Sequence, residues 1–553
     1  MSALKTPDVD VVVVGAGFAG MYATHLLRAK NNLTVQGFER GSGVGGTWFW
    51  NRYPGARCDA ESIVYSYSFD DDIQQEWTWS ERWATQPEIL EYANFVADKI
   101  GIRDAFRFNT EVASMAWDDE SQTWTTTTAA GDKTVSKYVV TAVGCLSASQ
   151  VPDFKGLSDY TGEVYHTGAW PHEGVDFTGK RVCVIGTGSS GIQSIPRIAE
   201  AADHVTVFQR TATFTVPAQN RPLGVDEMAQ VKAVYPALRE HAKSTAAGVI
   251  VKQPIGRALE LDADTVRAEL DARWAQGGPT FMNAFTDTMS DLAANEITAE
   301  YVRERVREIV QDPETAELLS PHAYPIGTKR ICVDTDYYET YNRDNVDLVS
   351  VKEHPIEKIG TRGPVVNGVE YDCDVLVMAT GFDAITGPLL RLNITGSEGL
   401  PLSEAWAEGG KSYLGLAVAG FPNMFTVTGP GSPSVLTNMI LSIEQHVEWI
   451  TDFLLDLEEA GVGVVEASPQ AQEQWVADVN AIADQTLYPQ AASWYMGSNV
   501  PGKARVFMPY AGGADAYRAI CDEIASSGYS GFIMDAGASE RAEQRQEEMA
   551  PVV

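Results

Sequence analysis

The chain has 553 residues and a formal net charge of −34, because 75 Asp and Glu outnumber 41 Lys and Arg. Its length predicts three or four structural units at roughly 150 residues each, and 44% hydrophobic residues suffice for a large core. The strong negative charge repels phosphate backbones and anionic lipid, so it argues against nucleic-acid and membrane-surface functions.

Cysteine and histidine spacing argues against a metal site or a disulfide scaffold. The six cysteines lie far apart, and the eight histidines show no paired spacing typical of metal ligands. The first ten residues are polar, and the apolar run at residues 11–27 holds three glycines, so we expect neither a secretory leader nor a membrane span. A cytoplasmic protein without a metal is the expectation.

Two glycine-rich turns stand in the same context. Residues 9–14 predict a buried parallel strand, followed by Gly15-x-Gly17-x-x-Gly20, a helix at residues 21–30 and a strand at 33–38. Residues 181–185 predict a second such strand, followed by Gly186-Thr187-Gly188-Ser189-Ser190-Gly191, a helix at 192–201 and a strand at 204–208. We therefore predict two Rossmann-like dinucleotide-binding domains in an α/β fold.

The residue that ends each second strand distinguishes the two nucleotides. Glu39, 19 residues after Gly20, predicts hydrogen bonds to ribose hydroxyls, as for the adenosine of FAD. Arg210, 19 residues after Gly191, predicts a 2′-phosphate and hence NADPH. FAD and NADPH are thus the expected cofactors, bound in that order along the chain.

The rest of the chain completes these domains around an insertion. Residues 221–327 are rich in Glu, Ala, Arg and Asp at helical spacing and predict a helical insertion. A strand is expected at 375–379 and an amphipathic helix at 438–457, with Ile443, Val447, Ile450, Leu454 and Leu457 on one stripe. We expect an FAD-binding domain at 1–148 and 378–540, an NADPH-binding domain at 149–220 and 328–377, and a disordered tail at 541–553.

One stretch before the second turn indicates a family. Tyr160-x-Gly162-x-x-x-His166-x-x-x-Trp170-Pro171 resembles the signature of the type I Baeyer–Villiger monooxygenases, with Tyr160 where the family has Phe. Residues 45–59, Lys329-Arg330 and Ser493-Trp494-Tyr495 also resemble family blocks. The resemblance extends from Val9 to about Met534 and is strongest to the phenylacetone and steroid monooxygenase branch, whose active-site loop residues 429–439 match.

The resemblance implies an NADPH- and O₂-dependent conversion of ketones into esters or lactones through a flavin C4a-peroxide. In it Arg330 is the catalytic cation, which favours the peroxyanion and then the oxyanion of the adduct. Asp59 holds this arginine, and His166 couples the nucleotide domains without acting as an acid or base. The same positions predict a substrate pocket formed by Ser434, Val435, Leu436, Met439 and the mobile Trp494.

The resemblance also places the cofactor contacts. Lys329 and Arg210 would clamp the 2′-phosphate, with a hydroxyl from Thr211. Trp48, Asp59 and Tyr65 would contact FAD. Other expected cofactor contacts are Thr47, Arg57, Val112, Thr187, Gly188, Ser189, Ser190, Gly191, Gln193, Arg330 and Trp494.

Other classes fit the sequence less well. A disulfide reductase needs a cysteine pair near the first turn, where Cys58 is alone, and no G-x-S-x-G elbow indicates a hydrolase. A flavin-containing N- or S-oxygenating monooxygenase shares both turns but lacks Trp170-Pro171 and the Asp59–Arg330 pair. A redox sensor or an uncoupled NADPH oxidase is the remaining alternative. The expected partners are a ketone substrate and O₂. The expected assembly is a monomer or a weak homo-oligomer.

Overall fold

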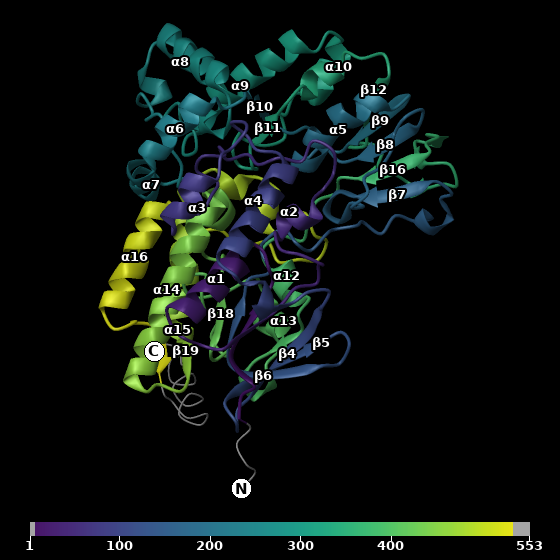
Figure 1. Cartoon of the computed structure of the whole chain (residues 1–553). Helices are drawn as coiled ribbons and strands as arrows, with labels where there is room; N and C mark the ends of the chain where they lie inside the picture. The colour runs from purple at the N-terminus through teal and green to yellow at the C-terminus, as the bar shows by residue number, and fades with distance from the viewer. Residues whose placement is uncertain (1–5, 535–553) are drawn as a thin grey trace, which may run out of the picture.

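The computed structural model describes residues 6–534 as a mixed α/β fold with two parallel sheet cores (Figure 1). The tail predicted at residues 541–553 lies outside the described residues. The first core forms the lower part of the molecule in Figure 1, the second lies to its upper right, and a group of helices covers both at the top.

The first sheet is built around the first glycine turn. Its order is β17 (Ile394–Thr395), β4 (Val112–Asp118), β5 (Thr123–Thr128), β6 (Lys133–Thr141), β1 (Val9–Val14), β2 (Val35–Phe38) and β3 (Phe106–Arg107), with β18 (Met424–Thr426) also paired to β6. β1 pairs in parallel with both β2 and β6, so it is central, and Val11, Val12 and Val13 are fully buried. β4, β5 and β6 form an antiparallel ribbon that the sequence did not predict.

The second sheet is entirely parallel and surrounds the second glycine turn. Its order is β12 (Val346–Ser350), β9 (His204–Gln209), β8 (Arg181–Ile185), β16 (Val375–Met378) and β7 (Glu163–His166). The side chains of β8 alternate between two apolar clusters. Val182 and Val184 pack against helix α5 (Ser189–Ala201), and Cys183 and Ile185 belong to the cluster on the other face of the sheet. Short pairs complete the strands: β10 (Thr215–Pro217) with β11 (Cys332–Asp334), β13 (Lys358–Ile359) and β15 (Val369–Glu370) with β14 (Pro364–Val366), and β19 (Val465–Ala467) with β20 (Phe532–Met534).

The helices fall into three groups. Those of the first core are α1 (Phe18–Ala29), α2 (Thr47–Trp50), α3 (Asp71–Glu76), α4 (Gln86–Lys99), α12 (Gly387–Leu390), α13 (Leu402–Ala405), α14 (Met439–Ala460), α15 (Pro469–Asp484) and α16 (Ala514–Ser526). The second core has α5 and α11 (Tyr337–Thr340). The top layer of Figure 1 holds α6 (Val225–Ala233), α7 (Tyr235–Lys243), α8 (Ala263–Gln276), α9 (Leu292–Ile309) and α10 (Pro313–Leu319).

The top layer corresponds to the predicted helical insertion, because between β10 and β11 the described chain is helical and irregular without a strand. It packs on the first core through Arg239 of α7, which donates to Ser66 Oγ at 2.7 Å and to the Gln74 side chain at 3.1 Å. The domain boundaries that the sequence predicts stay predictions.

Helix α14 differs from the expected amphipathic helix. The five predicted apolar residues are buried, but so are Glu444, Gln445, His446 and Thr451 on its other sides. The cause is its place in the fold, since α1 packs on one side of it and α16 on another (Figure 1). Glu444 has a local partner, because the Ser68 hydroxyl donates to its carboxylate at 2.7 Å.

Candidate active site and nucleotide-binding sites

Both glycine turns have the backbone that a pyrophosphate requires. Gly15 and Gly186 have φ values of +104° and +109°, which favour glycine. A Cβ on Gly20 would lie 1.7 Å from the Gly15 carbonyl oxygen, and one on Gly191 would lie 2.3 Å from that of Gly186. Each third glycine therefore lets its helix start directly against the strand that precedes it.

The first turns of α1 and α5 offer free backbone donors. Gly17 and Gly188 are the N-cap residues and supply no capping side chain, and neither first turn carries an acidic residue. A Cβ on Gly188 would meet no atom within 4 Å, so space remains in front of the helix. Unpaired N–H groups at the positive end of a helix fit an anionic pyrophosphate.

Glu39 closes the first turn from the end of β2. Its carboxylate accepts from the backbone N–H of Ala16 at 2.8 Å and from that of Gly41 at 2.6 Å, and the side chain is buried. Each carboxylate oxygen keeps a further lone pair for a ribose hydroxyl. Val112, another predicted cofactor contact, lies in an apolar cluster with Val14 and Phe38, the last residues of β1 and β2.

Two cations meet beside the second turn. Burial lowers the pKa of Lys329 below its ordinary value, and the positive charge of Arg210 lowers it further. Neither side chain makes an ion pair within residues 6–534, although the chain is strongly acidic. Thr187 Oγ donates to the carbonyl of Thr211 at 3.3 Å, which fixes the start of this loop. The pair lacks a counter-charge, as expected for a phosphate site.

The predicted catalytic residues are in contact. Arg330 Nε donates to Asp59 Oδ2 at 2.6 Å and Nη2 donates to Oδ1 at 2.8 Å, so the pairing is bidentate. Arg330 Nη1 donates to the backbone carbonyl of Val435. The guanidinium thus joins the segment after β1 and α2 to the predicted substrate loop.

The ion pair fixes the charges of both partners. Burial favours the neutral form of Asp59, but the charge and hydrogen bonds of Arg330 outweigh it and hold the pKa of Asp59 below its ordinary value. Burial likewise works against the Arg330 cation, but the charge of Asp59 raises the pKa of Arg330 well above its usual range. Arg330 therefore stays cationic at any working pH.

The pair lies next to the second nucleotide loop. Gln193 of α5 accepts from Tyr53 Oη at 2.8 Å and donates to the carbonyl of Arg57 at 3.1 Å. Ser189 lies beside the Cys332 thiol, and Ser190 lies beside Tyr53. On the other side, Trp48 Nε1 donates to Tyr65 Oη at 3.1 Å, whereas Thr47 is exposed. The residues predicted for FAD and for NADPH thus adjoin one another around Arg330.

The predicted substrate residues share one apolar cluster. Val435 is buried, and Leu436, Met439 and Trp494 are half-buried members of the same cluster. Ser434 begins a single 3₁₀ turn with φ of +43° and is fully buried. Trp494 stands in the 3₁₀ turn Trp494–Met496, with its ring 4.4 Å from that of Tyr495. The cluster therefore forms an apolar wall near the cation.

His166 lies where the chain crosses between the two cores. The two crossings pair with each other, since Gln150 N donates to Gly381 O at 2.9 Å. His166 Nδ1 accepts from Gly168 N at 2.9 Å, and Nε2 lies 3.3 Å from Thr380 Oγ, whose hydroxyl donates to Gln150 O. Burial lowers the pKa of His166, so it is a neutral structural residue here.

Arg57 differs in orientation from the other predicted cofactor cations. Its guanidinium lies 3.7 Å from Glu81 and 3.4 Å from the carbonyl of Trp83, to which it donates, instead of standing with Arg210 and Lys329. Its contribution near the second loop is its own carbonyl, which Gln193 contacts.

Several residues around the Asp59–Arg330 pair could not be recognised from the sequence as part of the site. Tyr495 and the thiols of Cys58, Cys145 and Cys332 lie close enough to Arg330 for its charge to act on them. Burial raises the pKa of Cys145 to about 11 and that of Cys332 to about 12, so both stay protonated. Only the adjacency of Tyr495 to Trp494 in the sequence could have indicated it.

A metal site and a membrane span find no support in the described part of the chain. There, no three His, Cys, Asp or Glu side chains cluster closely enough to hold an ion. No helix within residues 6–534 combines the length and the apolar character needed to cross a bilayer.

The comparisons with known proteins identify the family of the chain. A family model described as flavin-binding monooxygenase-like matches residues 8–221. The chain is 41% identical over 531 residues to a Baeyer-Villiger monooxygenase of Pseudooceanicola batsensis, covering 96% of both chains. The chain belongs to the Baeyer–Villiger monooxygenase family. Its Tyr160 is therefore a variation within the family signature.

Two further similarities place this Baeyer–Villiger monooxygenase family member among its relatives. The solved structure of an oxidized steroid monooxygenase bound to NADP matches with a TM-score of 0.91 and 49% identity, covering 95% of this chain and 99% of that one. A phenazine N-monooxygenase of Lysobacter antibioticus is 40% identical over 528 residues, which is 95% of this chain and 97% of that protein. The relatives thus include oxygenation at nitrogen as well as Baeyer–Villiger chemistry.

Proposed function

We propose that the protein is an NADPH- and O₂-dependent FAD enzyme that inserts one oxygen atom beside a ketone carbonyl to give an ester or lactone. The observation that carries this proposal is the Arg330 guanidinium, fixed by Asp59 and bonded to the Val435 carbonyl of the substrate loop. Family membership and the two glycine turns support the cofactors.

The residues fit both cofactors. The α1 turn and Glu39 would hold FAD, with Trp48 and Tyr65 beside it. The α5 turn would hold the NADPH pyrophosphate, and Arg210 with Lys329 would hold the 2′-phosphate. When bound, NADPH supplies a hydride and the flavin supplies the centre at which O₂ is activated.

Arg330 would stabilise negative charge on oxygen. Three of its five N–H donors are used by Asp59 and Val435, and two remain near the Tyr495 hydroxyl. Because the guanidinium is already held in place by a carboxylate, it needs no reorganisation to donate to an oxyanion that forms beside the carbonyl carbon. The apolar wall of Leu436, Met439 and Trp494 would exclude water and receive the ketone's hydrocarbon part.

The test is a conversion assay with purified, FAD-loaded protein. NADPH is supplied with a panel of linear, cyclic, aryl and steroid ketones, and products are separated by gas chromatography with mass spectrometry. Esters or lactones are expected from at least one class. Hydrogen peroxide alone from every ketone would contradict the proposal.

The role of Arg330 has its own variant. Arg330→Ala should still bind FAD but lose ester formation by roughly 10²–10³-fold, because one preorganised donor group is removed. Arg28→Ala, which removes an exposed arginine paired with Asp104, is the matched control and should retain full conversion. Normal conversion in Arg330→Ala would refute the assigned role.

N- or S-oxygenation is the second candidate, favoured by the phenazine N-monooxygenase among the relatives. The same assay with phenazine and a thioether separates the two. An N-oxide or sulfoxide formed with a kcat/KM above that of every ketone would make ketones secondary substrates. Slower heteroatom oxidation would leave ester formation as the main activity.

The quaternary and cellular state is part of the proposal. We propose a monomer or weak homo-oligomer of the cytoplasm, supported by the free cysteines among the described residues. Light scattering during size-exclusion chromatography tests the first point, and cell fractionation tests the second.

A further inference from the structure

Arg239 of helix α7 is a buried cation that bonds only uncharged groups. Nη2 donates to Ser66 Oγ at 2.7 Å and to the Tyr67 carbonyl at 3.4 Å. Nη1 donates to the Val64 carbonyl at 3.4 Å, and Nε donates to Gln74 Oε1 at 3.1 Å. The residue is only 9% exposed, and no carboxylate of residues 6–534 lies within ion-pair distance of it. A buried charge is costly unless its N–H groups find partners, so Arg239 is tied to the segment that supplies them.

Residues 64–67 form an irregular segment of the first core that depends on side chains for its backbone hydrogen bonds. The segment is neither helix nor strand, so its buried N–H and carbonyl groups need partners from elsewhere. Arg239 supplies donors to two of its carbonyls. Asn438 Nδ2, at the N-cap of α14, donates to the Val64 carbonyl at 2.7 Å. The position of the segment is therefore set by the helical insertion together with the start of α14.

The same segment contacts the predicted FAD site in two places. Tyr65 Oη accepts from Trp48 Nε1 at 3.1 Å. Tyr67 Oη donates to the carbonyl of Phe18, the first residue of α1 after the glycine turn. The Phe18 ring also makes edge contacts with both tyrosines, at centroid distances of 6.1 and 5.4 Å. A shift of residues 64–67 would thus move Trp48 and the start of α1 together.

We propose that Arg239 is a positioning residue for FAD, which acts through residues 64–67 on Trp48, Tyr65 and the start of α1. The helical insertion is thereby a functional part of the FAD site, although no predicted cofactor contact lies within residues 221–327. The observation behind it is the chain of hydrogen bonds from Arg239 through the segment to Trp48 and α1. This role rests on the proposed place of FAD beside the α1 turn, Trp48 and Tyr65.

Loss of the guanidinium would leave buried acceptors with fewer donors. The Ser66 hydroxyl and the Tyr67 carbonyl would move towards other partners, and the side chains of Tyr65 and Tyr67 would move with them. FAD binding would then have to restore the geometry, so part of its binding free energy would be used to order the segment. FAD should therefore leave such a variant faster than it leaves the wild type.

The test measures FAD release from the holoenzyme of Arg239→Gln. After dilution into buffer without FAD, the fluorescence of the released flavin is followed over time at 25 °C. Release should be roughly ten- to hundredfold faster than in the wild type, the range expected for lost hydrogen bonds to a charged group. KM for NADPH, measured with excess FAD, should stay unchanged because the second glycine turn lies in the other core.

Arg273 of α8 provides a matched control within the same insertion. It is 1% exposed, and it donates to Glu269 at 2.6 Å and to the carbonyls of Lys252 and Gln253 at 3.0 and 2.9 Å. All of these partners lie inside the insertion. Arg273→Gln should therefore lower the melting temperature, recorded by circular dichroism, and leave the rate of FAD release as in the wild type.

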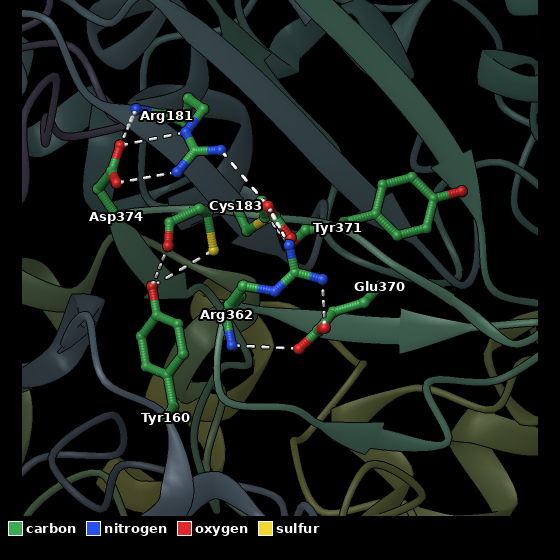
Figure 2. A network of polar contacts seen from close by, with 9 residues as sticks. Tyr160, Arg181, Cys183, Arg362, Glu370, Tyr371 and Asp374 are labelled. Atoms are coloured by element: carbon green, nitrogen blue, oxygen red, sulfur yellow. Dashed lines mark hydrogen bonds and ion pairs between the residues drawn. The ribbon is translucent and has the colours of Figure 1, made fainter.

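The polar network on the second core supplies a control outside the insertion (Figure 2). Arg362 donates to Glu370 at 2.9 Å and to Asp372 at 2.7 Å, and its side chain is 61% exposed. Exposed ion pairs contribute little to stability. Arg362→Gln should therefore leave both the melting temperature and FAD release close to the wild-type values.

Two milder variants keep the test decisive if Arg239→Gln does not fold. Arg239→Lys keeps the charge but cannot bond all four partners, so its release rate should lie between those of the wild type and Arg239→Gln. Ser66→Ala removes only the 2.7 Å bond and should speed FAD release roughly three- to tenfold. Ser320→Ala is its control, because that buried hydroxyl donates to the Ala316 carbonyl at 2.8 Å, and it should release FAD at the wild-type rate.

Three outcomes would overturn the positioning role of Arg239. FAD would leave Arg239→Gln at the wild-type rate, Arg273→Gln would release FAD as fast as Arg239→Gln, or Ser66→Ala would show no change. Any of these results together with normal ester formation would leave the proposed function intact. Tight FAD binding in a wild type that forms no ester from any ketone would contradict the proposed function and leave the role of Arg239 intact.

Discussion

Asp59 and Arg330 stand 271 residues apart in the chain, yet Asp59 accepts two parallel hydrogen bonds from the Arg330 guanidinium, at 2.6 and 2.8 Å. We propose Asp59 as the positioning residue for this cation. In Asp59→Asn one of the two bonds and the counter-charge are lost, so the guanidinium should shift and ester formation should fall about 10²-fold. The measurement is kcat for ester alongside the yield of hydrogen peroxide.

A positioning role has a signature that a general loss of structure lacks. Reduction of the bound flavin by NADPH should proceed at the wild-type rate in Asp59→Asn, while electrons pass increasingly to hydrogen peroxide. Glu61→Gln is the matched control. Glu61 lies two residues after Asp59, and this substitution breaks its 2.6 Å ion pair with Arg82. Equal losses in the two variants would argue against a specific role for Asp59.

The choice of NADPH over NADH should depend on Arg210 and Lys329. Truncating Arg210 to Ala removes a charged hydrogen-bond donor worth roughly 1.5–3 kcal/mol, so KM for NADPH should rise roughly ten- to hundredfold. KM for NADH should change little. Arg197→Ala, on the exposed side of α5 where it pairs with Asp336 at 2.8 Å, should leave both values unchanged. A parallel rise for both nucleotides would disprove the phosphate contact.

The second turn permits a sharper test of its glycines. Gly191→Ala would place a Cβ 2.3 Å from the Gly186 carbonyl oxygen, so the backbone must move and the melting temperature should fall. Gly188→Ala meets no atom within 4 Å at a φ of −81°, so it should fold normally but raise KM for NADPH. Thermal melts and NADPH titrations of the two variants check this. Wild-type affinity in Gly188→Ala would place the nucleotide elsewhere.

Asp334 should make stability depend on pH. Burial raises the pKa of Asp334 to about 7, although the Thr215 hydroxyl donates to it. A carboxyl that binds its proton more tightly when folded stabilises the fold below its unfolded pKa, and this contribution is lost as the pH rises towards 7. The loss amounts to at most about 4 kcal/mol from the size of the shift.

Asp334→Asn removes this titration while keeping an acceptor for Thr215. Its melting temperature should match the wild type near pH 4 and exceed it increasingly as the pH rises to 8. Asp203→Asn is the control, because Asp203 is an exposed aspartate directly before β9. Its melting temperature should depend on pH as that of the wild type does. A constant difference between Asp334→Asn and wild type would mean that Asp334 does not titrate in this window.

The features that could be predicted from sequence are those with a local physical cause. The strand–turn–helix units were predictable because a carbonyl lies where a Cβ on Gly20 or Gly191 would be. The antiparallel ribbon β4–β6 was missed, since the threonine-rich β5 carries no long apolar run. The polar side of α14 is also buried because α1 and α16 pack on it. The hydrophobic periodicity of residues 438–457 does not depend on these helices and so could not predict this burial.

The site was predictable only as far as side chains identify it. The positions of Asp59 and Arg330 came from the family resemblance, because nothing in their local sequences indicates a contact between them. The bond from Arg330 to Val435 uses a backbone carbonyl, which every residue type shares. Arg57 was expected with the other cations because of its charge, but Glu81 and the carbonyl of Trp83 hold its guanidinium.

The pairing of β18 with β6 has a consequence for how the protein is made. Thr141 and Thr426 hydrogen-bond at 3.1 Å across this pair and are 285 residues apart in the chain. During synthesis β6 can pair with β1 and β5, but its pairing with β18 must wait until the second core and the helical insertion have left the ribosome. The second core has all of its strands by Met378 and can fold first, while the emerging first core keeps an open strand edge. The chain's dependence on chaperones should accordingly concentrate in its amino-terminal third.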